Sequence, residues 1–398
     1  MLYEINQDAL AYEMEHLGVY PPSVAIMLNK GKIVPLKVLQ VRTPAANIIK
    51  QEMLAVGGEC ATPGTTIACS VPFVDILLLG TRKHYNLLLK KLKQMPYFGI
   101  PKIVPELECY LQPVPKSTLL ADGRRLTYDQ MAVMGIINVT PDSFFAGSRR
   151  PGLDAALQQA ETMLADGAAI LDIGGESTRP GSDPVGQEEE MRRVLPVVEA
   201  IKKRFPASMI SVDTYRAAGG EAAMQCGGDI INDVTAMTGD AAMLGTVLKT
   251  KAPIVLMHMR GKPKDMQQQC EYTNVVQEVT SYLLARAQLL RAEGVAPEKI
   301  ILDPGIGFAK KTEQNLRLMQ NLNALTANEY PVLMAASRKT TIGQALSAGQ
   351  QPLPPEERLE GTLAVTAAAL YAGAAMVRVH DVKENLRLIR MLEAIRNV

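Results

Sequence analysis

The segment Ala132-Val-Met-Gly-Ile-Ile-Asn-Val139 is the first of eight short apolar runs that recur along the C-terminal two thirds of the chain. Runs of this length, rich in Ile and Val, are typical of strands that are buried on both faces, because such strands need no polar side. The eight runs cover residues 132–139, 168–173, 209–213, 229–233, 253–257, 299–302, 331–335 and 374–379.

A stretch with the apolar spacing of an amphipathic helix accompanies each of these strands. The predicted helices cover residues 154–166, 187–204, 216–225, 240–250, 274–293, 313–325, 356–372 and 383–396. Buried strands that alternate with helices predict a parallel sheet. Eight such units in about 260 residues fit a closed (β/α)8 TIM barrel, an α/β fold. An open doubly wound sheet would give the same local pattern, so the number of units is the main support for the barrel.

The first 112 residues follow a different pattern, and we place a domain boundary near residue 112. Prolines cluster between Pro96 and Pro115, and proline interrupts both helices and strand ladders. The predicted helices of residues 1–112 cover 8–17, 47–56 and 84–93, and the predicted strands cover 32–41 and 74–79. We therefore expect a small α/β domain, to which its sequence assigns no role. The barrel domain covers residues 113–398 and opens with a hairpin around Asp122-Gly123.

Composition and charge exclude several classes of protein. Hydrophobic residues make up 47% of the 398 residues, which is enough for a large core. The 42 Lys and Arg residues balance 41 Asp and Glu residues, so the chain lacks the cationic excess of a nucleic-acid surface. The longest uncharged stretch that could be a membrane span, residues 361–377, is shorter than the ~20 residues that cross a bilayer. We expect no secretory signal, because no cationic start precedes an apolar run.

The cysteines indicate a reducing compartment. The five cysteines are odd in number and form no C-x-x-C pair, which argues against both a disulfide framework and a zinc site. We therefore expect a cytoplasmic protein with neither a membrane nor a nucleic acid as partner.

Polar side chains stand at or just after the end of every predicted strand. In a barrel these ends meet at one mouth, where active sites are built. A buried carboxylate is costly to fold, so eight polar ends out of eight are hard to attribute to folding alone. The residues are Asn138, Asp172, Asp213, Asn232, His258, Asp303, Ser337-Arg338-Lys339, and Arg378 with His380.

The residue types at the mouth suit a planar heterocycle. Asp213, Asn232 and Asp303 combine acceptors with one amide, which matches a ring edge with adjacent N–H groups, such as an aminopyrimidinone. Lys339 can meet a carbonyl or nitrogen of that ring.

Other mouth residues suit an anion. Asn138, Arg378 and His380 can hold an anion or its metal ion. Phosphate-binding loops of known type are absent, because residues 305–312 lack the second glycine of a P-loop and do not complete G-x-G-x-x-G. With four histidines and no H-E-x-x-H motif, a zinc hydrolase has no support.

Eight sequence blocks carry a family resemblance. They are Met134-Gly-Ile-Ile-Asn-Val-Thr-Pro-Asp-Ser-Phe144, Asp172-Ile-Gly-Gly-Glu-Ser-Thr-Arg-Pro-Gly181, Ser211-Val-Asp-Thr214, Ile230-Ile-Asn-Asp-Val234, Leu256-Met-His-Met259, Asp303-Pro-Gly-Ile-Gly-Phe308, Ser337-Arg-Lys339 and Arg378-Val-His-Asp-Val382. From about Ser117 to its end the chain resembles dihydropteroate synthase, a pterin-condensing enzyme of folate biosynthesis. The blocks stand in the family's order and cover every predicted strand end.

The resemblance implies an activity and two sets of ligands. The family is a transferase that joins 6-hydroxymethyl-7,8-dihydropterin diphosphate to 4-aminobenzoate, giving 7,8-dihydropteroate and diphosphate. The implied pterin ligands are Asp213, Asn232, Asp303 and Lys339. The implied cofactor is Mg²⁺, with Asn138 as its ligand.

The resemblance also implies the surroundings of the diphosphate and of the second substrate. Arg378 and His380 resemble an anion clamp at the diphosphate and, with Lys339, are the implied catalytic residues. The wall of the aminobenzoate pocket would be formed by Phe144, Thr178, Arg179, Pro180, Phe308 and Thr340. Phe308 equally fits a core position, and Asp172 and Glu176 equally fit a brace for their loop. The implied assembly is a homodimer.

Two departures from the family keep alternatives open. The first loop continues Phe145-Ala146-Gly147 where relatives usually have Ser-Asp-Gly, and residues 1 to about 112 lie outside the usual single-domain enzyme. A methyltetrahydrofolate–corrinoid methyltransferase shares the barrel, but it has no diphosphate to bind. A non-catalytic pterin-binding regulator would need neither the metal ligand nor the anion clamp.

We predict that Ala146→Asp lowers the Mg²⁺ concentration needed for half-maximal rate, with a smaller change in affinity for 4-aminobenzoate. Mg²⁺ prefers oxygen ligands and keeps several waters, so an added outer carboxylate improves its positioning. Titrating Mg²⁺ against the rate tests this. An unchanged Mg²⁺ dependence in both Ala146→Asp and Asp142→Ala would mean that this loop does not organise the metal.

Overall fold

The computed structural model divides into two compact units, Met1–Val114 and Pro115–Val398. It describes residues 2–3, 5–139, 149–176, 185–261, 265–347 and 349–396. The division falls two residues after the predicted boundary.

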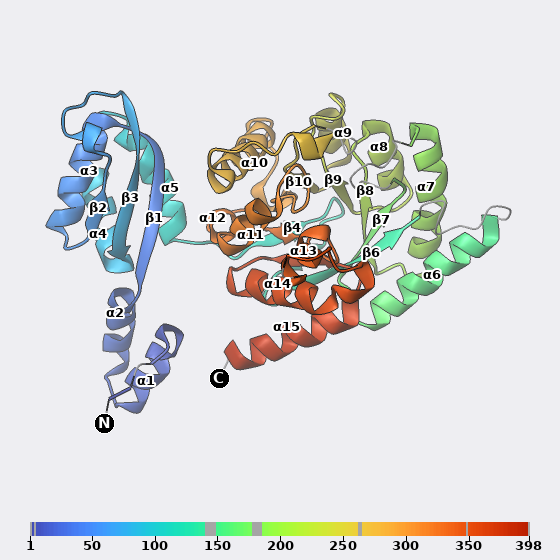
Figure 1. The fold of residues 1–398 in the computed structure, drawn as a ribbon, viewed down its shortest axis with the longest axis horizontal. Helices are drawn as coiled ribbons and strands as arrows, with labels where there is room; N and C mark the ends of the chain where they lie inside the picture. Colours follow the sequence, from blue (N-terminus) through green and yellow to red (C-terminus); the bar gives the residue numbers. More distant parts are fainter. Residues whose placement is uncertain are drawn as a thin grey trace. The chain divides into compact units, whose positions relative to one another are not determined.

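The second unit is a barrel of eight parallel strands (Figure 1). The strands are β6 (Ala132–Asn138), β7 (Ile170–Gly174), β8 (Met209–Asp213), β9 (Ile230–Asp233), β10 (Ile254–Met257), β11 (Ile300–Asp303), β12 (Leu333–Met334) and β13 (Met376–Val379). They lie in the order β11-β10-β9-β8-β7-β6-β13-β12. A parallel bridge between Leu302 and Val332 joins the two ends, and the Leu302 amide donates to the Pro331 carbonyl over 2.9 Å. The predicted (β/α)8 fold is confirmed.

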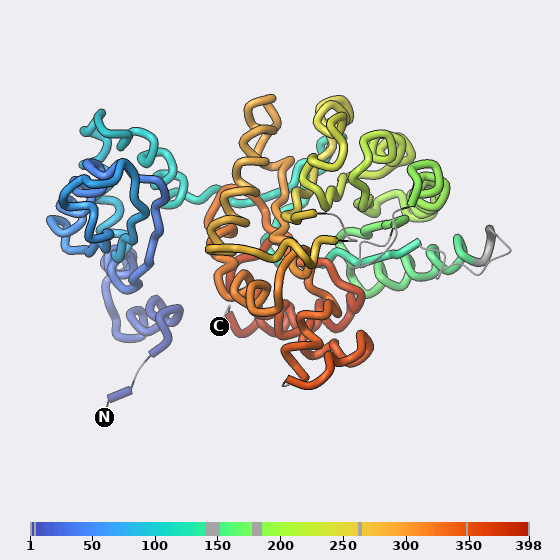
Figure 2. The backbone as a smooth tube through the Cα atoms, turned by 45° about the horizontal axis from the view of Figure 1, so that its top comes forward, coloured from blue at the N-terminus to red at the C-terminus, as the bar shows by residue number. Residues whose placement is uncertain are grey.

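Helices surround the strands (Figure 2). They are α6 (Arg149–Ala165), α7 (Gln187–Arg204), α8 (Ala217–Gln225), α9 (Met243–Thr250), α10 (Val275–Ala292), α11 (Thr312–Gln320), α12 (Asn323–Thr326), α13 (Thr340–Leu346), α14 (Leu359–Tyr371) and α15 (Val382–Arg396).

One helix prediction was wrong in this unit, and one helix was missed. The helix predicted over 313–325 is broken at Asn321 and Leu322 into α11 and α12. Helix α13 was not predicted, because it is short and begins with Thr340 and Thr341, whose branched side chains lower helix propensity. Tertiary contact stabilises it instead, since the Asn315 amide donates to the Thr341 hydroxyl over 2.9 Å.

A hairpin lies at the end of the barrel where the strands begin. Strands β4 (Ser117–Leu119) and β5 (Arg125–Thr127) pair antiparallel, as predicted around Asp122-Gly123. Leu120, directly after β4, is 2% exposed and belongs to a cluster of interior residues near the strand starts. Its partners are Ala132, Met134, Ile170, Ile230, Val255, Ile301, Leu333 and Met376. This apolar layer fills the base of the barrel, which leaves the opposite end as the mouth.

The first unit contains a three-stranded antiparallel sheet in the order β1-β3-β2. Its elements are α1 (Leu10–His16), α2 (Pro21–Gly31), β1 (Ile33–Arg42), α3 (Thr43–Ala55), β2 (Glu59–Ala61), β3 (Phe73–Thr81), α4 (Arg82–Leu92) and α5 (Ile100–Leu111). Helices α3 and α4 pack on the sheet through a core that includes Ile49, Ile76 and Leu88. Side chains on the other face, such as Ile33 and Phe73, are exposed.

Three elements of this unit were missed from the sequence: α2, β2 and α5. Prolines hid both helices, since Pro21 and Pro22 open α2 and Pro101 is the second residue of α5. Proline is tolerated in a first turn, where its missing N–H would have no partner in the helix. The proline cluster that marked the boundary is therefore partly helical.

No helix among the described residues is both long and apolar enough to cross a membrane.

We predict that a fragment from Gln112 to Val398 folds on its own. The barrel has its own apolar clusters, and the first unit has a separate one around Ile49 and Leu88. Circular dichroism during heating, with the full chain as control, should show one cooperative transition for the fragment. Persistent aggregation of the fragment would instead show that residues 1–111 cover apolar barrel surface.

Candidate active site

A partly buried arginine organises the centre of the mouth. Arg378 lies on β13, and its Nε donates to Asp172 Oδ2 on β7 over 2.6 Å. Its Nη2 donates to Asp213 Oδ2 at the end of β8 over 3.0 Å. The Asn232 amide on β9 donates to both carboxylate oxygens of Asp172, each over 3.3 Å. Residues from four strands thus form one polar cluster.

The surroundings of this cluster shift the pKa values of its ionisable groups. Burial raises the pKa of Asp213, and Asp172 adds to the shift while Arg378 opposes it. For Arg378, burial acts to lower the pKa, but the Asp172 and Asp213 carboxylates outweigh it and raise the pKa above its usual value. Arg378 therefore stays charged, and Asp213 holds a proton at higher pH than an exposed carboxyl does.

Asp172 is the member of the cluster whose role the sequence left open. It is fully buried and contacts both Arg378 and Asn232. Its carboxylate faces the barrel interior rather than the loop that follows β7, so the structure supports a role in orienting mouth residues.

Lys339 and Asp303 form a second polar group. Lys339 precedes α13, and its Nζ donates to the Ile306 carbonyl over 2.5 Å. The same Nζ lies 4.6 Å from the centre of the Phe308 ring, within cation–π range. Burial lowers the pKa of Lys339 to about 8, and Asp303 opposes the shift. Burial likewise raises the pKa of Asp303, whose Oδ1 accepts from the Gly305 amide over 2.7 Å.

His380 lies beside the same part of the mouth. Its Nδ1 is 3.0 Å from the Ser337 hydroxyl, which also accepts from the His380 backbone N–H over 3.2 Å. The two contacts fix the ring of His380 against the loop that leads to Lys339. The polar residues predicted at the ends of β12 and β13 therefore lie next to each other.

The other predicted residues differ in position. Asn138 ends β6 next to Gly174 in the ladder, and it is exposed. Phe308 is 8% exposed and packs with Val234 and Met257, so it serves the core as well as the mouth. Thr340 is exposed at the start of α13. The remaining expected wall residues lie outside the described residues; they are Phe144, Thr178, Arg179 and Pro180.

The side chains at the mouth offer few ligands for Mg²⁺. Within the described ranges, no three His, Cys, Asp or Glu side chains group so that they could hold a metal ion. Mg²⁺ bound with a phosphorylated substrate needs only one or two protein oxygens, because phosphate and water supply the rest. The exposed amide oxygen of Asn138 at the mouth fits that kind of site.

Arg216 is a polar residue that the sequence did not single out. It follows β8, and its guanidinium donates to Glu176 over 2.7 Å and to the Val185 carbonyl over 2.5 Å. It also contacts Glu190 on α7. Arg216 thus ties together the residues on either side of segment 177–184. No local motif signals this role, because Glu176, Val185 and Glu190 lie 26 to 40 positions away in the sequence.

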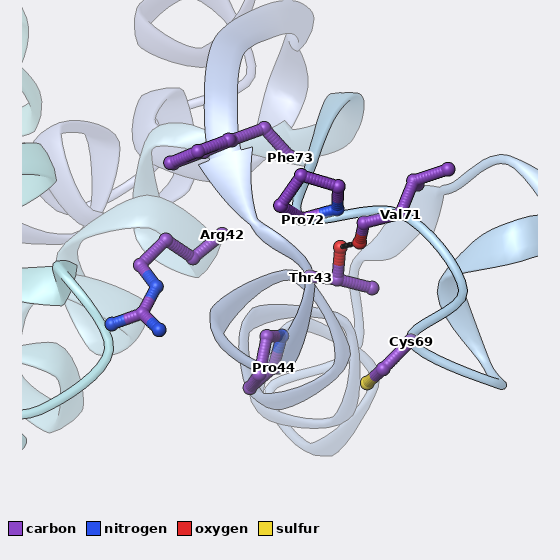
Figure 3. Close-up of a pocket in the computed structure, with 7 residues that line it drawn as sticks. All are labelled: Arg42, Thr43, Pro44, Cys69, Val71, Pro72 and Phe73. Carbon is purple, nitrogen blue, oxygen red and sulfur yellow. Dashed lines mark hydrogen bonds between the residues drawn. The ribbon is translucent and has the colours of Figure 1, made fainter.

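A hollow of about 490 Å³ lies in the first unit (Figure 3). It opens beside the start of α3, where the Thr43 hydroxyl donates to the Val71 carbonyl. Its lining residues are Arg42, Thr43, Pro44, Cys69, Val71, Pro72 and Phe73. They offer one cation and one thiol, whereas the barrel mouth combines carboxylates, amides and cations. The mouth is the better candidate for an active site.

Comparisons with known proteins agree with this placement. The family model described as pterin binding enzyme matches residues 134–380. A dihydropteroate synthase of Synechocystis sp. is 42% identical over 283 residues, which are 71% of this chain and 95% of that protein. The solved structure of the Xanthomonas albilineans dihydropteroate synthase with 4-aminobenzoic acid has a TM-score of 0.65 and 38% identity, and it covers 72% of this chain and 100% of its own.

One relative extends the similarity beyond the barrel. A Halobacterium salinarum protein, described as a probable bifunctional folylpolyglutamate synthase/dihydropteroate synthase, is 37% identical over 385 residues. These residues are 96% of this chain and 45% of that protein, so the match includes most of the first unit. The barrel mouth, the family model and these relatives agree: the chain belongs to the dihydropteroate synthase family, the pterin-binding transferases of folate biosynthesis.

Proposed function

We propose that the barrel mouth joins 6-hydroxymethyl-7,8-dihydropterin diphosphate to 4-aminobenzoate, with 7,8-dihydropteroate and diphosphate as products. The observation that carries the proposal is the single buried polar cluster in which Arg378, Asp172, Asp213 and Asn232 meet. Its donors and acceptors match the edge of a pterin ring.

The pterin ring binds between the two polar groups. Asp213 and Asn232 face it from one group, and Asp303 with Lys339 from the other. Asp172 orients Arg378 and Asn232, because both donate to its carboxylate. The low exposure of these residues excludes water, which strengthens each hydrogen bond to the ring.

The diphosphate lies at the side of the mouth where Asn138, Arg378 and His380 stand. Mg²⁺ there would be held by the Asn138 amide oxygen and by the diphosphate, and it would neutralise charge on the leaving group. The Arg378 guanidinium, fixed in plane by Asp172 and Asp213, adds positive charge on the same side. His380 is held against Ser337, next to Arg378 on the same strand end, and would add to the positive side of the site.

The substitution is largely dissociative. The bond from the pterin methylene carbon to the diphosphate oxygen breaks, and the electron-rich pterin stabilises the cationic carbon that remains. The neutral aromatic amine of 4-aminobenzoate then forms the new C–N bond and loses a proton to solvent. No strong protein base is needed, so catalysis comes from orientation and from stabilisation of the leaving group's charge.

We propose that Phe308 and Thr340 contact the aminobenzoate. The family resemblance adds four residues that lie outside the described ranges: Phe144, Thr178, Arg179 and Pro180. The Phe308 ring supports this by its contact with the Lys339 ammonium, a proposed pterin ligand.

We also propose that the protein is a cytoplasmic homodimer. No disulfide joins the cysteines within the described part of the chain, which suits a reducing compartment. Size-exclusion chromatography with light scattering tests the dimer.

Purified protein should release diphosphate only when the pterin diphosphate, 4-aminobenzoate and Mg²⁺ are all supplied. The reason is that the leaving group's charge must be neutralised before the bond breaks. A coupled diphosphate assay, with dihydropteroate measured by chromatography, checks this. Methyl transfer to cobalamin without diphosphate release would identify a methyltransferase, and pterin binding without turnover would identify a regulator.

The KM for the pterin substrate should rise as the pH passes about 8, because the Lys339 ammonium then loses its proton. Lys339→Met should raise this KM at pH 7 by roughly 10- to 100-fold, as for loss of a charge-assisted hydrogen bond, and should abolish the rise above pH 8. Initial rates between pH 6.5 and 9.5 test both effects.

Lys311→Met is the matched control for Lys339→Met, since the Lys311 side chain is 67% exposed. It should leave the KM and its pH profile unchanged. If Lys339→Met kept the alkaline rise, another group would be responsible for it.

A further inference from the structure

We infer that Lys310 is a positioning residue: together with Asn315 it folds the loop 304–309 so that this loop orients the Lys339 ammonium in the pterin site. The inference rests on the proposed function of Lys339 as a pterin ligand, and it assigns a role to a buried lysine outside the recognised blocks.

Lys310 is a lysine inside the protein rather than on its surface. Its residue is 3% exposed, whereas the side chain of the adjacent Lys311 is 67% exposed. Burial lowers the pKa of Lys310 well below its usual value, and the Asp303 carboxylate opposes the shift. A buried cation is costly unless it is bonded on all sides, so its surroundings need explanation.

Four acceptors surround Lys310 Nζ. They are the carbonyls of Gly305 and Phe308, each 2.9 Å away, the carbonyl of His258 at 3.2 Å, and His258 Nδ1 at 3.0 Å. Burial and the nearby lysine lower the pKa of His258 to about 2, so its ring is neutral and can accept. Two of the acceptors belong to the loop itself, and the loop therefore wraps around the amine.

The backbone of loop 304–309 has an unusual conformation that other contacts must stabilise. Gly305 has φ +67°, and a Cβ atom at this position would lie 2.0 Å from the His258 carbonyl oxygen, so only glycine fits. Ala309 also has positive φ, at 51°. Backbone in this region is costly for a residue with a side chain and persists only where other contacts hold it.

Asn315 on α11 fastens the same loop from the other side. Its Oδ1 accepts from the Gly307 N–H over 2.9 Å, and its Nδ2 donates to the Lys310 carbonyl over 3.2 Å. The Asn315 side chain is fully buried. Two buried polar side chains thus determine the loop's shape.

The loop in turn holds Lys339. Lys339 Nζ donates to the Ile306 carbonyl over 2.5 Å and lies 4.6 Å from the centre of the Phe308 ring. Ile306 lies between Gly305 and Phe308, whose carbonyls bind Lys310. Loss of the Lys310 hydrogen bonds therefore displaces the Ile306 carbonyl and the Phe308 ring, which orient the Lys339 ammonium.

The test measures the Kd of 6-hydroxymethyl-7,8-dihydropterin diphosphate with Mg²⁺ by isothermal titration calorimetry, without 4-aminobenzoate. Lys310→Met should weaken binding by roughly tenfold, as for one weakened charge-assisted hydrogen bond, and the control Lys311→Met by less than about twofold. A purely structural role would lower thermal stability without this change in affinity.

A double-mutant cycle with Lys339→Met separates positioning from an independent effect. If Lys310 acts through Lys339, adding Lys310→Met to Lys339→Met changes the Kd by less than about twofold. If the fold-changes in Kd from the two substitutions multiply in the double variant, the inference is wrong. An unchanged Kd in Lys310→Met alone would also overturn it. Because the wild-type protein and Lys339→Met are measured first, failure of Lys339 to affect binding would contradict the proposed function and not this inference.

Asn315→Ala keeps the inference testable if Lys310→Met does not fold. This variant loosens the same loop without removing a buried amine, and it should weaken pterin binding and show the same non-additivity with Lys339→Met. Full pterin affinity in Asn315→Ala would overturn the inference.

Discussion

The ion pair between Arg378 and Asp172 determines the shape of the barrel mouth. Asp172 is fully buried and the Arg378 side chain is 17% exposed, so neither charge has full access to water. Removing one partner of such a pair generally costs about 3–5 kcal/mol, because the other charge remains buried alone. The pair joins β13 to β7 across β6, and Asp213 and Asn232 extend it to β8 and β9. The strands and the polar cluster therefore constrain one another.

Burial favours the neutral form of three ionisable groups in the mouth. It raises the pKa values of Asp213 and Asp303 and lowers that of Lys339, so each group is pushed toward its neutral form. An incoming anion reverses part of this, since negative charge nearby stabilises an ammonium group. The free site is thereby less charged than the site that holds a diphosphate, which reduces the cost of keeping it dry.

The barrel could be predicted closely from the sequence, because each buried parallel strand leaves a short apolar run with a polar end. The predicted strand 209–213 coincides with β8, and the others differ by one or two residues at one or both ends. The first unit was harder. Its helix α5 has Pro101 in its first turn and Pro105 further along, and these prolines indicated a domain boundary although the packed helix accommodates both.

The candidate site was predictable as a set of residues but not as a set of contacts. Strand ends identified Asp213, Asn232 and Asp303, since topology alone brings them together. The partners of Asp172, Arg216 and Lys310 could not be read, because these bonds join residues far apart in the chain or depend on an unusual loop backbone. Packing decides such contacts, and a single sequence carries little information about packing.

The neighbours of β6 have a consequence for how the chain is made. This first strand of the barrel pairs with β7 on one side and with β13 on the other, so that Ala132 lies opposite Met376. During synthesis the ring stays open until the last strand leaves the ribosome, and the edges of β6 and β12 remain unpaired meanwhile. Contacts so distant in sequence slow folding and expose strand edges to other chains. The first unit, whose sheet pairs only residues 33–81, is complete long before that moment.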